Sequence, residues 1–255
     1  MQDITSQSNA KIKYIRSLAQ KKARMEHKEY TVEGVKSVRD ALASDREITA
    51  LYASYSFAAD EEFVYPDNIP VYRVADEIFE KICDTKTPQG ILAVIKMGDN
   101  GFTPDKGGVY VYCDRLQDPG NLGTIIRTAD AAGVSGIMLS EDCADLYSPK
   151  TVRASMGSFF NINVMTGVSA KTLADYADNG FTIYGGALCD DSIPYTEADF
   201  TKPCIIVIGN EANGITGEVL RLCECVKIPI IGKAESLNAG VAAAVLMYEA
   251  LRQRS

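Results

Sequence analysis

Apolar residues in the first part of the chain recur at the spacing of a single helical face. Ile12, Ile15, Leu18 and Ala19 form one stripe within residues 10–25, which predicts a helix with one buried face. The same part of the chain is expected to contain strands at 29–34, 48–53, 70–74 and 90–95 and a helix that ends at Ala43. These elements predict a small α/β unit.

A segment rich in glycine, proline and aspartate, residues 96–108, follows this unit and has the composition of a linker. Beyond it, apolar runs of strand length alternate with segments of helical length. We expect strands at 109–113, 136–140, 161–165, 181–187, 204–208 and 226–230, and helices at 121–132, 149–157, 169–179, 213–222 and 238–252. This alternation predicts an α/β fold in which a mostly parallel sheet is covered by helices. The predicted domains are residues 1–100 and 106–255.

The composition is that of a folded protein, since 46% of the 255 residues are hydrophobic. The N-terminus lacks the apolar region of a signal peptide, and no stretch is long enough to span a bilayer. We therefore expect a soluble protein of the cytoplasm.

The numbers and positions of the cysteines and of the histidine exclude several kinds of catalytic and metal site. The seven cysteines have no framework spacing, which argues against a disulfide scaffold or a zinc site, and Cys113 and Cys204 are expected to be buried. His27 is the single histidine, and it lies in a polar run. A multi-histidine metal site and a hydrolase triad are therefore excluded, and His27 is expected to be an ordinary surface residue.

The formal net charge of −8 is unfavourable for contacts with nucleic acid, but the charges are unevenly distributed. Residues 1–30 carry seven lysines and arginines against three acids, a local +4, so the other 225 residues carry −12. A basic segment on an acidic body is typical of a localised nucleic-acid contact. The candidate residues are Lys11, Lys21, Lys22 and Arg24. On charge alone, a solvated helix face is an equally good interpretation.

Three polar loops each follow an apolar run and lead into a predicted helix. The first contains Pro119-Gly-Asn-Leu-Gly123 and is followed by Arg127, the second is Gly209-Asn-Glu-Ala-Asn-Gly214, and the third is Ser236-Leu-Asn238. Open α/β sheets bind ligands in loops at the carboxyl ends of their strands. Either Ser236 or Asn238 can also cap the last helix, because its side-chain oxygen can accept from unpaired N–H groups.

In order and in residues, these segments resemble the three motifs of the SpoU-type RNA 2′-O-ribose methyltransferases of the SPOUT superfamily. The resemblance covers roughly Gly107 to the C-terminus. It implies S-adenosylmethionine as the cofactor, RNA as the substrate, a homodimer, and a C-terminal trefoil knot through which the last helix is threaded. The chemistry requires no metal.

Shorter patterns extend the resemblance to the N-terminal unit. Lys21-Lys-Ala-Arg24, Val32-Glu-Gly34 and Asp84-Thr-Lys-Thr-Pro-Gln-Gly90 are similar to patterns of the L30-like substrate-binding domain attached to many of these enzymes. They favour ribosomal RNA of the 23S type over tRNA.

The resemblance also identifies site residues. The residues expected to have catalytic roles are Asn121, Arg127, Glu211, Ser236 and Asn238. The residues expected to contact the cofactor are Gly209, Gly214, Ile228, Leu237 and Asn238. Arg127 is expected to contact the RNA as well.

Two interpretations of Arg127 follow from its position. It lies six residues after Asn121, about 600° of helical rotation, so the two side chains need not share a face. On a helix surface Arg127 would simply pair with Asp130. The resemblance implies instead that it binds phosphate and helps to activate the ribose 2′-hydroxyl. Because a guanidinium resists deprotonation, we favour stabilisation of the developing alkoxide over proton removal.

The second loop has the glycine spacing of a phosphate-binding P-loop but not its chemistry. Ile215 stands at the position of the P-loop lysine, and Glu211 would repel phosphates. An uncharged turn lined by backbone amides suits S-adenosylmethionine better. Glu211 is expected to hold the loop or an arginine in place, or to interact with a helix N-terminus.

The third loop departs from the family pattern, in which Val-Ser usually follows Ser-Leu-Asn. This chain has Ala239-Gly240, which leaves no hydroxyl at position 240. Gly240 and Ala242–Ala244 would allow another helix to approach closely.

We therefore expect an S-adenosylmethionine-dependent RNA 2′-O-ribose methyltransferase. The alternatives are an enzyme that acts on tRNA and a non-catalytic RNA-binding protein that keeps the cofactor fold. A nicotinamide-dependent oxidoreductase is disfavoured, because no predicted strand is followed by G-x-G-x-x-G.

Overall fold

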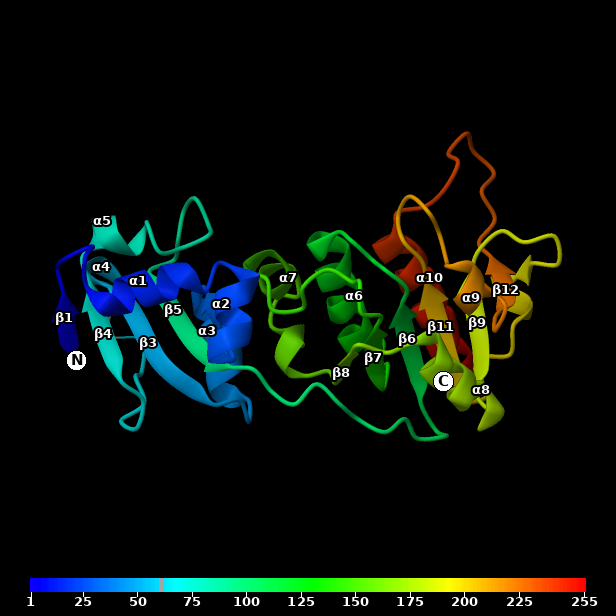
Figure 1. The fold of residues 1–255 in the computed structure, drawn as a ribbon, viewed down its shortest axis with the longest axis horizontal. Helices are drawn as coiled ribbons and strands as arrows, with labels where there is room; N and C mark the ends of the chain where they lie inside the picture. The colour runs from blue at the N-terminus through cyan, green and yellow to red at the C-terminus, as the bar shows by residue number, and fades with distance from the viewer. Residues whose placement is uncertain (60–61) are drawn as a thin grey trace. The chain divides into compact units, whose positions relative to one another are not determined.

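The computed structural model describes residues 1–59 and 62–255 and divides into two compact units (Figure 1). Unit 1 comprises Met1–Asp99 and Asp145–Phe160, and unit 2 comprises Asn100–Ala144 and Asn161–Ser255. No helix within the described ranges is long and apolar enough to cross a membrane.

Unit 1 is a mixed sheet with helices. Its strands are β1 (Gln2–Ile4), β2 (Glu29–Glu33), β3 (Ile48–Ser54), β4 (Val71–Val74) and β5 (Ile91–Lys96), in the order β1-β4-β3-β5-β2. Its helices are α1 (Ala10–Ser17), α2 (Lys21–His27), α3 (Val35–Ala43), α4 (Tyr55–Ala58), α5 (Asp76–Phe79) and α7 (Pro149–Ala154), followed by a 3-10 turn at Ser158–Phe160. The predicted apolar stripe is confirmed at Ile12, Ile15 and Leu18, which are buried in the core against β3 and β5, whereas Ala19 is exposed.

The single helix predicted over 10–25 was wrong, because the chain breaks between α1 and α2. The Arg24 side chain stabilises the break. Its Nη1 donates to the carbonyl oxygens of Leu18 at 2.7 Å and Ala19 at 2.8 Å. Carbonyl groups at a helix end have no partner within the helix, and here a side chain from the next helix supplies one.

The segment 145–160 packs within unit 1, although the sequence placed it inside the C-terminal domain. The ring of Tyr30 on β2 lies 4.8 Å from the ring of Tyr147 and 5.6 Å from that of Phe159. Tyr30 is almost completely buried. Burial of this aromatic cluster, rather than position in the sequence, determines which unit the segment joins.

Unit 2 is a parallel sheet covered by helices. Its strands are β6 (Val109–Cys113), β7 (Gly136–Leu139), β8 (Val164–Thr166), β9 (Thr182–Gly186), β10 (Ile193–Pro194), β11 (Cys204–Ile208) and β12 (Glu224–Lys227), in the order β10-β12-β9-β11-β6-β7-β8. Every neighbouring pair is parallel. Its helices are α6 (Pro119–Ala131), α8 (Ala170–Asp178), α9 (Gly217–Leu220) and α10 (Ala239–Arg254), and a 3-10 turn lies at Tyr195–Glu197. The predicted α/β class is confirmed.

Two helices that begin at the candidate loops pack together in unit 2. Helix α10 contacts α6 as well as strands β9 and β11, and α8 contacts α9. The C-terminal end of α10 is fastened by Arg254, whose Nε donates to Phe200 O at 2.6 Å and whose Nη1 donates to Gly107 O at 2.7 Å. The trefoil knot stays a prediction.

Three predicted elements of unit 2 differ from the observed ones. The strand expected at 161–165 is β8, which begins only at Val164. The strand expected at 226–230 is β12, which ends at Lys227, and Pro229 just beyond it has no N–H to donate to a sheet. The helix expected at 213–222 is only α9. Gly214 adopts a φ of +67° and pairs with Asn210 in an isolated bridge, so the chain forms a turn before the helix.

Candidate functional site

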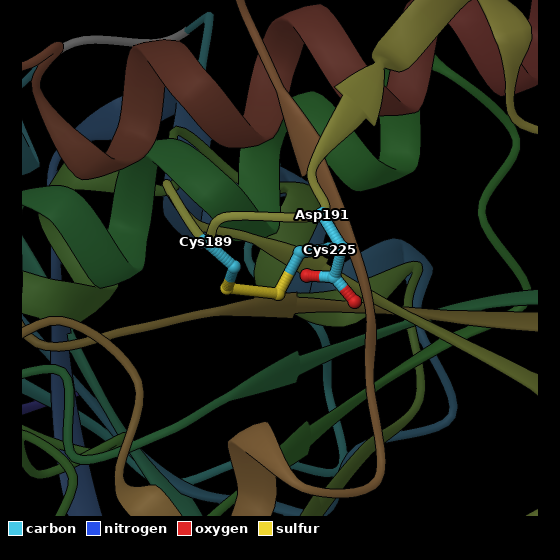
Figure 2. A group of neighbouring side chains, drawn as sticks. All are labelled: Cys189, Asp191 and Cys225. Atoms are coloured by element: carbon cyan, nitrogen blue, oxygen red, sulfur yellow. A yellow bond between two sulfur atoms is a disulfide. The ribbon is translucent and has the colours of Figure 1, made fainter.

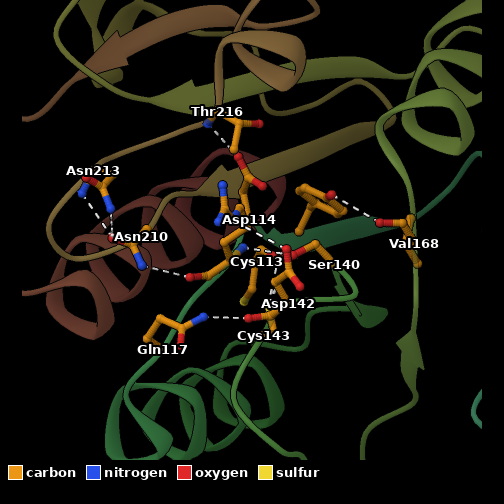
Figure 3. Close-up of polar contacts among 12 residues, drawn as sticks. Cys113, Asp114, Gln117, Ser140, Asp142, Cys143, Val168, Asn210, Asn213 and Thr216 are labelled. Atoms are coloured by element: carbon orange, nitrogen blue, oxygen red, sulfur yellow. Dashed lines mark hydrogen bonds and ion pairs between the residues drawn. The ribbon is translucent and has the colours of Figure 1, made fainter.

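Two of the three loops begin side by side at the carboxyl end of the sheet. Strands β6 and β11 are paired in register, with Cys113 opposite Ile208, and Asp114 N donates to Ile208 O at 2.8 Å. The buried Asp114 carboxylate then accepts from Thr216 N at 2.6 Å (Figure 3). Strand pairing and this bond together position the first two loops.

Glu211 is the acceptor that joins these two loops. Its carboxylate accepts from the backbone N–H groups of Gln117 and Asp118, both at 3.1 Å, and from Asn121 Nδ2 at 2.9 Å. Partial burial raises the pKa of Glu211, but these hydrogen bonds outweigh that effect and hold the pKa below its ordinary value. Glu211 therefore anchors the first loop by accepting three hydrogen bonds from it.

Asn121 connects this anchor to the third loop. Its Oδ1 accepts from Asn238 Nδ2 at 2.9 Å. Asn238 in turn caps α10, because its Oδ1 accepts from Gly240 N at 2.9 Å and Val241 N at 3.2 Å. Three predicted site residues, Glu211, Asn121 and Asn238, thus form one continuous chain of hydrogen bonds across the three loops.

Gly240 allows α10 to lie against α6. A β-carbon at this position would lie 3.1 Å from Thr124 Cγ2, closer than nearly all real contacts of that kind. Thr124 stands one turn before Arg127 on α6. Glycine at position 240, in place of the family's usual serine, therefore allows α10 to approach α6 closely within the chain.

Arg127 projects from the exposed side of α6. It makes no ion pair among the described residues, and Asp130 instead accepts from Asn161 Nδ2 at 3.1 Å. The simple surface pairing of Arg127 with Asp130 is thus not observed. The Arg127 guanidinium is available to a ligand.

The second loop closes tightly on itself. A β-carbon on Gly209 would lie 2.3 Å from the backbone carbon of Gly214, so only glycine fits. Asn210 Oδ1 accepts from the N–H groups of Ala212 and Asn213, both at 3.0 Å. These hydrogen bonds stabilise the turn from within the loop.

The segment from Ile228 to Asn238 carries the remaining predicted residues. Ile228 is half-buried, whereas Ser236 and Leu237 are exposed, and Ile231 is 99% exposed. Figure 1 shows this segment, in orange, projecting beyond the carboxyl ends of the strands of unit 2. No hydrogen bond among the described residues joins Ser236 to the Glu211–Asn121–Asn238 chain.

These loops fit the adenosine and methionine parts of S-adenosylmethionine. Neither Lys nor Arg occurs in the loop from Gly209 to Gly214, and the Glu211 charge is already satisfied by N–H donors. Exposed apolar groups such as Leu237 suit an uncharged nucleoside. The residues that would hold the cofactor are Gly209, Gly214, Ile228, Leu237 and Asn238.

The basic residues of the N-terminal segment divide into two kinds. Lys21 and Lys22 are exposed on α2, and Lys11 lies with its Nζ 4.3 Å from the centre of the Tyr72 ring. Arg24 is buried and donates from Nη2 to Asp145 at 2.5 Å. Arg24 therefore supports the fold of unit 1, and its predicted role in RNA binding was wrong because the guanidinium is not accessible.

Sequence reasoning missed several residues that build the site. The backbone donors at Gln117 and Asp118 precede the first motif glycine and carry no side-chain signal, since only their N–H groups bind Glu211. Asp114 was detectable in principle, because an acid that directly follows a buried strand requires a partner.

A disulfide in unit 2 was also not predicted. Cys189 and Cys225 are joined across 36 positions, and the Asp191 side chain lies beside them (Figure 2). Their three potential ligand atoms lie within 4.8 Å of one another, but the sulfur atoms are already bonded to each other. Cys113 and Cys204 are fully buried, as predicted, and His27 is exposed, as predicted.

Comparisons with known proteins agree with this geometry. Residues 108–248 match the SpoU rRNA Methylase family, and residues 9–93 match the MRM3-like substrate binding domain. A Bacillus subtilis protein named 23S rRNA (guanosine(2553)-2'-O)-methyltransferase RlmP is 34% identical, over 97% of this chain and 98% of the relative.

Solved structures resemble the whole chain as well. An AdoMet-bound rRNA methyltransferase from Sinorhizobium meliloti has a TM-score of 0.88 at 34% identity, over 98% of this chain and 97% of that one. The SpoU methyltransferase AviRb from Streptomyces viridochromogenes, in complex with AdoMet, has a TM-score of 0.83 at 28% identity, over 96% and 98% of the two chains.

Proposed function

The chain belongs to the SpoU rRNA methylase family, and we propose that it transfers a methyl group from S-adenosylmethionine to a ribose 2′-hydroxyl of ribosomal RNA. A relative of the same length carries that activity in its name, and the structural neighbours include two with AdoMet bound. The protein is an enzyme that uses this cofactor.

One observation carries the proposal for the site. The hydrogen-bonded chain Glu211–Asn121–Asn238 holds three loops together, while Arg127 on the same helix as Asn121 has no ion-pair partner in the described part of the chain. A preformed framework beside one free cation is the arrangement expected for binding and orienting an anionic substrate.

The cofactor supplies the methyl group, and the protein binds and orients the RNA. When bound, S-adenosylmethionine supplies a methyl group on a positively charged sulfur, and methyl transfer leaves a neutral thioether. The ribose oxygen gains the methyl group and loses its proton, which passes to solvent water. We assign to Arg127 the binding of the neighbouring phosphate and the stabilisation of negative charge on that oxygen. Proton removal by Arg127 itself is disfavoured, because its guanidinium remains charged.

The substrate we propose is 23S ribosomal RNA, bound through unit 1. Two observations support this: the match of residues 9–93 to a substrate binding domain, and the exposed Lys21 and Lys22 on α2. Lys11 completes the proposed basic surface. Because the substrate is ribosomal RNA, we place the protein in the cytoplasm.

We also propose that the enzyme is a homodimer. Helix α10 leaves Val241 and Tyr248 each 49% exposed and Leu251 38% exposed, and Ile231, in the segment that leads into the third loop, is 99% exposed. Apolar groups gathered on one helix and the adjoining loop favour a protein partner, and a second copy of the chain is the simplest one.

The test is transfer of labelled methyl from S-adenosylmethionine to unmodified ribosomal RNA and, separately, to tRNA. Label in ribosomal RNA that survives alkali at the linkage would support ribose methylation. Arg127→Ala should lower kcat by about a hundredfold or more while the cofactor Kd changes only a few fold. Lys171→Ala, on the exposed side of α8, is the matched control.

Two results would contradict the proposal. Label found only in tRNA would change the substrate class. Cofactor binding without transfer to either RNA, in the wild type, would favour a binding protein over an enzyme.

A further inference from the structure

A cavity of about 780 Å³ lies at the carboxyl ends of β6, β7 and β11. Its polar lining comes from the loops that follow these three strands, several of whose residues appear in Figure 3. The residues important here are Arg115, Gln117, Asp142, Asn210, Asn213 and Thr216. A cavity of this size accommodates a small organic molecule and is too large for a single ion.

Hydrogen bonds connect the residues of the cavity wall. Asn210 Nδ2 donates to Arg115 O at 2.9 Å, and Asn210 Oδ1 accepts from Asn213 Nδ2 at 3.2 Å. Gln117 Nε2 donates to Asp142 O at 2.5 Å. These bonds fix three carboxamide side chains at the rim, so their unused donors and acceptors have defined positions.

The ion pair between Arg115 and Asp142 at the cavity is weak. Arg115 Nε lies 3.6 Å from Asp142 Oδ2, and the two side chains are 57% and 68% exposed. An exposed pair at this distance contributes little to stability. The Arg115 guanidinium can therefore turn toward an anion without the loss of a strong partner.

The cavity adjoins the candidate site through shared residues. Gln117 lines the cavity with its side chain, and its backbone N–H donates to Glu211 at 3.1 Å. Asn210 precedes Glu211 in the second loop. Among the predicted site residues only Gly214 lines this cavity, so the cavity is a separate compartment on the same loops.

We propose that this cavity binds a single-stranded RNA nucleotide that neighbours the methylated one, with Arg115 on its phosphate and Asn213 and Gln117 on its base. This inference rests on the proposed function and adds a second point of substrate recognition. Carboxamide groups present a donor and an acceptor side by side, which suits the hydrogen-bonding edge of a base. Unstacked bases of single-stranded RNA are read through such edges.

The lining disfavours other occupants. An apolar ligand would leave the two charged groups and three carboxamides of the lining without hydrogen-bonding partners, and a nucleoside triphosphate would meet one arginine and the Asp142 carboxylate. A single nucleotide requires one cation and a few hydrogen-bonding groups. The cavity offers this set, with Arg115 as the cation and Gln117 and Asn213 as hydrogen-bonding groups.

The experiment compares Arg115→Asn and Asn213→Ala with the wild-type enzyme. Asparagine is chosen at position 115 because the backbone there has a φ of +56°, which asparagine tolerates. Lys171→Gln on α8 removes an exposed charge elsewhere and is the matched control. Methyl transfer to unmodified 23S rRNA is measured together with the cofactor Kd and the melting temperature.

We expect each cavity variant to raise the KM for RNA about tenfold, with the cofactor Kd and melting temperature within the range of the control. Short RNAs that contain the mapped target, with each flanking nucleotide replaced in turn, provide a second measurement. Wild-type enzyme should discriminate at one flanking position by about tenfold, and Asn213→Ala should reduce this preference.

Two outcomes would overturn the inference. One is an unchanged KM for RNA in both variants, and the other is a weakened cofactor Kd with RNA binding intact. If the wild type transfers no methyl to any RNA, the proposed function fails. RNA binding by Arg115→Asn and wild type, measured by fluorescence anisotropy without cofactor, still decides the role of the cavity.

Discussion

Asn121 and Asn238 lie 117 positions apart and share a hydrogen bond of 2.9 Å between their side-chain amides. The bond joins the first turn of α6 to the cap of α10. Asn121 also donates to Glu211, so both ends of its amide are used. An amide is the side chain best suited to this position, because it offers one donor and one acceptor in a fixed geometry.

Substitution can separate the two roles of Asn238, which are to cap α10 and to donate to Asn121. Asn238→Asp keeps an oxygen that caps α10 but loses the amide donor to Asn121, whereas Asn238→Ala loses both. We expect Asn238→Ala to lower the free energy of unfolding by about 1 kcal/mol and Asn238→Asp to lower it less. Both should lose methyl transfer. Urea unfolding and kcat measured on the same preparations check this, and full activity in Asn238→Asp would reduce Asn238 to a cap.

Glu211 should make the stability depend on pH in the acid range. Because hydrogen bonds from Asn121, Gln117 and Asp118 lower its pKa, its contribution is fully present above the ordinary glutamate value of 4.5. The contribution is lost as the pH falls through the lower pKa of the folded state. The stability difference between wild type and Glu211→Gln should therefore be large at pH 7 and shrink as the pH falls below 4.5.

Urea unfolding at a series of pH values measures that difference. Glu218→Gln, at an exposed glutamate on α9, is the control. A difference that stays constant from pH 7 to pH 3 would contradict the role of Glu211 as an ionised anchor.

Substitution of Arg24 should lower stability, whereas substitution of Lys21 and Lys22 should weaken RNA binding. Arg24→Ala leaves the Asp145 carboxylate without its buried partner, so we expect the free energy of unfolding to fall by about 3 kcal/mol. The double variant Lys21→Ala/Lys22→Ala should keep its stability and bind RNA more weakly, with a smaller dependence on salt. Chemical unfolding and RNA titrations at several salt concentrations distinguish the two. A stable Arg24→Ala variant with weakened RNA binding would reverse our assignment.

The disulfide should stabilise the oxidised protein. Its cysteines are 36 positions apart, and closing a loop of that length stabilises a fold by about 3–4 kcal/mol in the chain-entropy account. Cys189→Ser should remove that stability, and a reducing agent should make wild type and variant alike. Cys223→Ser, at a free and half-buried cysteine, is the control. Mass spectrometry after alkylation should find Cys189 and Cys225 unlabelled in oxidised wild type.

The local sequence was sufficient to predict an element whose burial follows directly from its own run of apolar residues. Strands β6 and β11 were predicted to the residue, because each is a continuous apolar run whose residues are all buried. The cap of α10 was also visible, since a capping oxygen acts on N–H groups only two or three residues away. Resemblance to family motifs then supplied the cofactor and the chemistry, which no periodicity reports.

Tertiary structure decided whatever depends on residues distant in the chain. The sequence determined that Arg24 is basic, but only the fold places its guanidinium against Leu18, Ala19 and Asp145 rather than in solvent. Likewise Glu211 could have held an arginine, and the fold gives it the N–H groups of the first loop instead. The physical reason is the same in each case: hydrophobic periodicity records which face of an element is buried, whereas a polar group's partner depends on the path of the whole chain.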